Sequence, residues 1–249
     1  MSMMIIMVAI ILFSCILAEK FSGKFGLPAL ILFMGIGMIF GSDGIFRISF
    51  DNYEITDKVC GVALCFIMFY GGFNTKWQAA KPVAARAIML STLGVAFTAV
   101  LTGGFCYFVL DFSMVDSFLV GAVLSCTDAA SVFSVLRKKK VNLKYNTASL
   151  LEVESGSNDP MAYMLTVIGL ALKSGDAMGN LAYVVFSQVF FGIVIGVGMA
   201  LIGLLLYKKG KIIPEGVDTI FVIALVLMTF GLTNYVGGNA FLSVYIMGI

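Results

Sequence analysis

The 249-residue sequence contains no histidine, and only 12% of its residues are Asp, Glu, Lys or Arg, where soluble domains have about 25%. The missing imidazole excludes histidine triads, histidine metal ligands and a histidine pH switch, so proton chemistry must use carboxylates. A net charge of +2 offers no basic field for nucleic acid. The cysteines show no C-x-x-C spacing and lie among apolar residues. We therefore interpret all five as buried thiols rather than zinc ligands or disulfides: Cys15, Cys60, Cys65, Cys106 and Cys126.

Hydrophobic residues make up 60% of the chain, and its mean hydropathy is +1.04. Several uncharged stretches reach the ~20 residues that a membrane-spanning helix needs, which indicates an all-α polytopic membrane protein. Helices are expected because backbone polar groups in lipid must pair within their own segment, and no alternating segments of a β-barrel are visible. Hydropathy and helix breakers predict nine segments, at about 3–18, 27–41, 58–73, 83–110, 115–136, 147–172, 180–207, 217–235 and 239–249.

The basic residues predict the orientation of the chain. Thirteen of the 16 lie in loops that follow odd-numbered segments, which places these loops in the cytoplasm and the N-terminus outside. We expect a multi-pass protein of the plasma membrane. The last segment reaches Ile249 after about 11 residues, only ~16 Å of helix. We therefore expect residues 1–249 to be an incomplete membrane transport domain, without a soluble domain, from a longer protein.

Away from their ends, the predicted segments contain four acidic residues: Asp128 in the fifth, and Glu152, Glu154 and Asp159 in the sixth. A charge in the middle of a bilayer costs at least ~2.5–3.5 kcal/mol on insertion scales, so intramembrane carboxylates are functional candidates.

The fifth segment contains a predicted helix break. Ser125, Thr127 and Asp128 carry side chains that hydrogen-bond nearby backbone and so compete with the helix. A break here would leave a carbonyl end that attracts cations and an amide end capped by Asp128, as in the discontinuous helices of secondary transporters. The alternative is an unbroken helix in which Ser and Thr bond back to the helix and Asp128 is paired.

In the sixth segment, helical spacing places Glu154 beside Asn158 and Ser155 beside Asp159. Pro160 has no N–H to give, which frees the carbonyl of the residue four positions earlier, Gly156. This hard-oxygen environment suits an alkali cation and contains no soft ligand for a transition metal. Alternatively, Glu154 and Asn158 tie this helix to a neighbour. Elsewhere, Gly192 and Gly196, and the glycines at 35, 37 and 41, predict close helix packing.

Four motifs together carry a family resemblance: Thr127–Ser131, Glu152–Ala162 (EVESGSNDPMA), Phe69–Phe73 (FYGGF) and Gly237–Leu242 (GGNAFL). Their residues and order resemble the cation:proton antiporter superfamily, in particular its NhaP-type potassium/proton branch, over essentially the whole chain.

The resemblance implies an NhaA-like antiporter fold of thirteen helices, with inverted repeats, crossing discontinuous helices in a core domain, and a separate dimerisation domain. Segments 115–172 would carry the ion site, and the protein would be a homodimer. A C-terminal regulatory domain outside this chain is a further expectation. The chain departs from the pattern in two ways: several relatives have an acidic residue where Tyr70 stands, and the second broken helix would lie beyond Ile249.

The resemblance also assigns roles to individual residues. Asp159 matches the residue that binds the ion and the proton, and Asn158 its partner in the electroneutral branch. Thr127, Asp128 and Ser155 would complete the site, so that Asp159, Thr127 and Ser155 would hold the alkali cation. Glu154 would brace the core, with Gly156 and Pro160 shaping the backbone around the site.

The sequence therefore predicts a secondary transporter that exchanges K⁺, or Na⁺, for H⁺ without a cofactor. Cation and proton would compete for Asp159, and exchange would be electroneutral and proceed by alternating access. Two alternatives remain open. One is a passive cation channel or a non-transporting membrane subunit, although no carbonyl filter or charge ring is evident. The other is an intramembrane aspartyl enzyme that uses Asp128 and Asp159 as a dyad, although the expected Gly-x-Gly-Asp pattern is absent.

Overall fold

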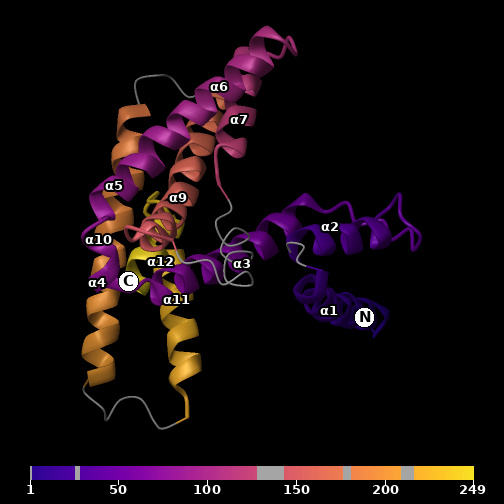
Figure 1. The fold of residues 1–249 in the computed structure, drawn as a ribbon, viewed down its shortest axis with the longest axis horizontal. Coiled ribbons are helices and arrows are strands. Elements are labelled where there is room, and N and C mark those ends of the chain that lie inside the picture. The colour runs from indigo at the N-terminus through magenta and orange to yellow at the C-terminus, as the bar shows by residue number, and fades with distance from the viewer. Residues whose placement is uncertain (1, 26–28, 128–142, 176–180, 209–215) are drawn as a thin grey trace. The chain divides into compact units, whose positions relative to one another are not determined.

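The computed structural model describes residues 2–25, 29–127, 143–175, 181–208 and 216–249. Every regular element in these ranges is a helix (Figure 1). This agrees with the all-α prediction, and each of the nine predicted segments contains an observed helix.

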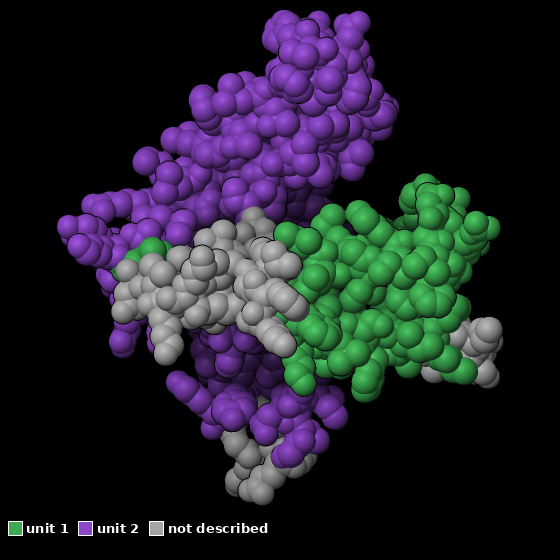
Figure 2. Space-filling view, turned by 45° about the vertical axis from the view of Figure 1, so that its right-hand side comes forward, with its two compact units in different colours: residues 1–57, 128–143 green, residues 58–127, 144–249 purple. Residues whose placement is uncertain are grey.

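The chain divides into two compact units, coloured separately in Figure 2. The first unit comprises residues 1–57 and 128–143, and the second comprises residues 58–127 and 144–249. In the first unit, α1 (Ser2–Phe25) packs against α2 (Ala29–Phe40). A Cβ atom added at Gly35 or Gly37 would meet no described atom within 4 Å, so these two glycines do not pack closely within this unit.

The second unit contains most of α3 and all later helices. Their bounds are α3 (Tyr53–Asn74), α4 (Trp77–Ala80), α5 (Ala84–Met89), the π-helical turn η1 (Leu90–Gly94), α6 (Val95–Phe108), α7 (Met114–Leu124), α9 (Thr147–Ser174), α10 (Leu181–Lys208), α11 (Asp218–Tyr235) and α12 (Ala240–Gly248). Within the described residues, four helices are long and apolar enough to cross a membrane: α3, the continuous α5–η1–α6 run, α10 and α11. The number of nine spans stays a prediction.

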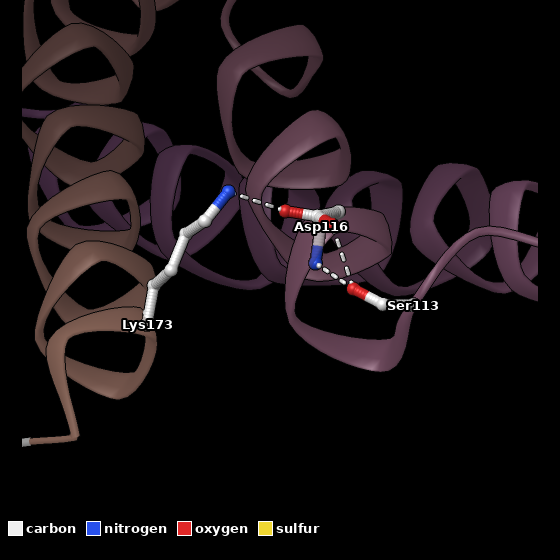
Figure 3. A network of polar contacts seen from close by, with 3 residues as sticks. All are labelled: Ser113, Asp116 and Lys173. Carbon is white, nitrogen blue, oxygen red and sulfur yellow. Dashed lines mark hydrogen bonds and ion pairs between the residues drawn. The ribbon is translucent and has the colours of Figure 1, made fainter.

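Helices α7 and α9 lie side by side and run antiparallel. At one end, Lys173 Nζ of α9 forms an ion pair with Asp116 Oδ1 of α7 at 2.7 Å (Figure 3). Further along, Gly169 of α9 faces the Leu119 side chain, whose Cγ lies 3.0 Å from the position of a Cβ on that glycine. The opposite end of α7 therefore meets the middle of α9, which sets the position of the candidate site.

Helix α12 packs closely and in parallel against α10. A Cβ on Gly192 would lie 3.1 Å from the Asn239 carbonyl oxygen, and one on Gly196 would lie 2.6 Å from that of Ser243. These contacts confirm the packing role predicted for Gly192 and Gly196, because any larger residue would separate the two backbones.

The turn before α12 is held by its neighbours. Gly237 adopts a left-handed conformation (φ 74°) that favours glycine. The Asn239 N–H donates to the Gln188 carbonyl of α10 at 3.0 Å, and its side-chain Oδ1 caps α12 by accepting from the Leu242 N–H at 3.0 Å. Its amide nitrogen donates to the Pro160 carbonyl of α9 at 2.8 Å. Asn239 thereby connects three helices and fixes where α12 starts.

The other end of α12 crosses α3. A Cβ added to Gly248 would lie 2.6 Å from the Phe69 carbonyl oxygen, and one added to Gly72 would lie 3.2 Å from the Gly248 Cα. Close by, Cys65 of α3 is buried with Val226 of α11 and Val244 of α12. Gly72 of the Phe69–Phe73 motif thus lies at a close helix crossing, whereas a Cβ on Gly71 would meet no described atom within 4 Å.

Candidate functional site

Helix α7 ends where the sequence predicts a break. Its last residue is Leu124, and Ser125 turns back on the helix, with its hydroxyl donating to the Ala122 carbonyl at 2.7 Å. Cys126 and Thr127 are not helical. This confirms that the helix ends before Thr127. Asp128 and the second half-helix lie outside the described residues.

Asn158 joins this non-helical end to α9. Its side chain is completely buried, and its amide nitrogen donates to the Thr127 hydroxyl and to the Thr127 carbonyl, the latter at 3.3 Å. The same nitrogen lies 3.4 Å from Glu154 Oε1, one helical turn earlier. The predicted proximity of Glu154 and Asn158 is therefore confirmed. Thr127, which is 31 residues earlier in the sequence than Asn158, also contacts Asn158.

Asp159 meets the preceding residue of the same non-helical end. The Cys126 thiol faces Asp159 Oδ1 as a hydrogen-bond donor. Two successive residues of the non-helical segment after α7 thus contact two successive residues of α9. Thr127 contacts Asn158, and Cys126 contacts Asp159.

The structure corrects the interpretation of the cysteines. Cys65 and Cys106 are buried as predicted, but Cys126 and Cys60 are exposed. Because Cys126 touches Asp159, a soft side chain lies beside the oxygen acceptors of this site. The sequence offered no signal for this contact, since it depends on the alignment of two helices.

The remaining predicted residues lie on α9 around this cluster. Ser155 is partly buried and precedes Asp159 by one helical turn, as its spacing requires. Gly156 lies beneath the ring of Tyr245 of α12, whose hydroxyl oxygen is 2.5 Å from the position of a Cβ on that glycine. Pro160 is fully buried inside α9, and its carbonyl accepts from Asn239. Sequence reasoning found neither the Tyr245 contact nor this hydrogen bond.

The cluster is rich in oxygen acceptors. It contains the Asp159 and Glu154 carboxylates together with the hydroxyl and carbonyl of Thr127. Within the described ranges, Asn158 Oδ1 is a buried acceptor without a hydrogen-bond partner. The same ranges hold no group of three or more His, Cys, Asp or Glu side chains arranged for a metal ion. Oxygen donors of this kind suit alkali cations.

Comparison with known proteins assigns the family. Residues 8–249 match the family described as sodium/hydrogen exchanger, transmembrane. The chain belongs to this exchanger family. It is accordingly an integral membrane protein of a transporter family and not of an enzyme family, which removes the aspartyl-enzyme alternative.

Curated relatives of this exchanger chain agree with the branch that its motifs resemble. It is 33% identical over 246 residues to the K(+)/H(+) antiporter NhaP of Alkalimonas amylolytica, which covers 98% of this chain and 43% of the relative. It is 35% identical over 240 residues to the K(+)/H(+) antiporter NhaP2 of Shewanella sp. (strain ANA-3), covering 94% and 41%. The probable Na(+)/H(+) antiporter 2 of Methanocaldococcus jannaschii is 26% identical over 180 residues, covering 72% and 42%. The exchanger chain therefore spans less than half the length of these relatives.

Proposed function

We propose that the protein carrying this chain exchanges a monovalent cation, preferentially K⁺, for H⁺ across the plasma membrane. The observation that carries the proposal is the cluster in which Thr127 and Cys126, at the end of α7, meet Asn158 and Asp159 in α9. The names of the K(+)/H(+) antiporter relatives support potassium as the cation.

Asp159 is the proposed ion-binding and proton-binding group. A proton and a cation each neutralise its charge, so they compete for the same carboxylate. If the neutralised site crosses the membrane and the empty anionic site does not, exchange becomes obligatory, because an unpaired charge in the bilayer is costly. Thr127 and Ser155 would supply further oxygens to the cation, and Asp128 would complete the site.

Asn158 has the role of a neutral partner in this proposal. Its amide donates to Thr127, and it adds no second titrating charge beside Asp159. One proton would then leave for each monovalent cation bound, which makes the exchange electroneutral. Glu154, at 3.4 Å from the Asn158 amide, would brace the core, while Gly156 and Pro160 shape the backbone.

The directions of the helices support the expected topology. Helices α7 and α9 run antiparallel, α10 and α12 run parallel, and α11 returns between them, with Thr233 of α11 bonded to Ser243 of α12. This alternation agrees with consecutive segments that cross the membrane in opposite directions. An N-terminus outside and an ion site in segments 115–172 are further parts of the proposal. Alternating access by an NhaA-like inverted-repeat fold, in a homodimer, completes the proposal.

The test is cation-driven proton movement in liposomes that contain the intact purified protein and a pH-sensitive dye. K⁺ and Na⁺ should each be compared at matched concentrations, with a larger response to K⁺. We expect Asp159→Asn to reduce the response to that of protein-free liposomes. Asp218→Asn, which removes an exposed carboxylate of α11, is the matched control and should retain exchange.

Two outcomes would contradict the proposal. Undiminished exchange in Asp159→Asn would remove Asp159 from the site. Ion currents above carrier rates in a planar bilayer would instead support the channel alternative. Electroneutrality is tested separately by imposing a membrane potential. The exchange rate should stay unchanged if the exchange is electroneutral.

A further inference from the structure

Among the residues contacting Asp159, Cys126 has a chemistry that the proposed function does not use. Its S–H faces Asp159 Oδ1 as a donor, across 33 residues of sequence. A thiol is a weak hydrogen-bond donor and a soft, polarizable group. It neither titrates like a carboxylate nor binds alkali cations as an oxygen does.

Two further observations show that this contact belongs to an ordered cluster. The neighbouring Thr127 is fixed by two hydrogen bonds from the Asn158 amide, so the position of Cys126 along α9 is set independently of its own thiol. Asn158 Oδ1 is completely buried and lacks a hydrogen-bond partner within the described residues. A buried acceptor without a partner calls for an explanation, and a bound cation would supply one.

We propose that Cys126 sets the cation affinity of the exchange site, where its thiol contacts Asp159 in competition with the cation and the proton. This inference rests on the proposed function. The thiol hydrogen bond stabilises the empty, anionic carboxylate, and an incoming cation must replace it. The thiol therefore weakens cation binding and speeds release, which favours turnover over affinity.

The first experiment measures cation affinity. In proteoliposomes of the intact protein, the half-saturating K⁺ and Na⁺ concentrations should be measured at alkaline pH, where protons compete least. We expect Cys126→Ala to lower both concentrations by about two- to tenfold, the effect of one weak hydrogen bond. The matched control, Cys60→Ala, removes an exposed thiol of α3 and should change neither value.

The second experiment tests the contact without relying on transport. Alkylation of Cys126 by N-ethylmaleimide is followed by mass spectrometry in the intact protein. The thiol must leave Asp159 before it reacts, and the adjacent negative charge opposes the thiolate that attacks the reagent. We expect Asp159→Asn to accelerate alkylation of Cys126 severalfold, while Asp218→Asn leaves it unchanged and alkylation of Cys60 does not differ among the three proteins.

The outcomes separate this inference from the proposed function. If the wild type exchanges ions and the cation affinities of Cys126→Ala and Cys60→Ala are identical, the role of Cys126 is overturned. The proposed function is then left intact. Alkylation of Cys126 that is insensitive to Asp159→Asn would overturn the contact itself. A wild type that binds no cation and shows no exchange would instead contradict the proposed function.

Discussion

The contact between α10 and α12 gives a prediction that can be worked through quantitatively. A Cβ on Gly196 would lie 2.6 Å from the Ser243 carbonyl oxygen and 3.1 Å from both the Ser243 Cα and the Ile246 Cβ. Ordinary contact begins at 3.4 Å. Gly196→Ala therefore requires the two backbones to separate by about 0.8 Å, and no flexible side chain is available to absorb the displacement.

The same helix provides an internal reference. A Cβ on Gly198 would meet nothing within 4 Å, so Gly198→Ala gains helix propensity without a clash. Replacing glycine by alanine within a helix stabilises the helix by about 0.5–1 kcal/mol, and this gain is the same in both variants. The difference between the variants thus isolates the overpacking, which typically costs about 1–3 kcal/mol. For a chain of this size that corresponds to roughly 2–12 °C in the unfolding midpoint.

The assay is the thermal unfolding midpoint of the intact, detergent-solubilised protein. It is measured for wild type and both variants by the fluorescence of an added dye rather than of tryptophan. We expect Gly196→Ala to unfold below wild type and Gly198→Ala at or above it. Equal midpoints for the two variants would refute the close approach of α10 and α12.

Two other substitutions test contacts at the start of α12 and at the far end of the α7–α9 pair, each followed by the same unfolding assay. Asn239→Ala removes both the α12 cap and the hydrogen bond to the Pro160 carbonyl, and we expect a loss of about 1–3 kcal/mol. Asn239→Asp keeps the capping acceptor but has no N–H for Pro160, so a wild-type midpoint in that variant would contradict the interhelical bond. Lys173→Met removes an ion pair whose side chains are 60% and 45% exposed. It should lower the midpoint far less than Asn239→Ala, and high salt should erase the difference; a loss as large as that of Asn239→Ala would show that the pair fixes α7 on α9.

Local features of the fold and the site were predictable from the sequence. The end of α7 before Thr127 follows from side chains that bond to nearby backbone, as the Ser125 hydroxyl does with Ala122. The approach of Asn158 to Glu154 follows from the spacing of residues on one helix. Both depend on residues at most four positions apart.

Contacts between helices were not predictable in this way. Whether Cys126 or a neighbouring residue meets Asp159 depends on how far α7 slides along α9, and an apolar setting in the sequence gave the wrong interpretation of this thiol. The seating of Tyr245 over Gly156 likewise depends on the placement of α12. Small residues in the motifs indicated close approach but did not identify the partner.

The π-helical turn at Leu90–Gly94 determines how one long helix serves two neighbours. Before this turn, Ala87 packs with Val153 of α9; after it, Gly103 lies against Ser117 of α7, with 3.0 Å between its Cβ position and the Ser117 carbonyl oxygen. A π turn accommodates one residue more than an α-helical path, and each residue of an α-helix advances by about 100°. The π turn thus absorbs one residue without rotating the helix that follows it. Winding the same residues as a regular α-helix would turn Gly103 about 100° away from α7, even though every side chain that makes the contact was retained.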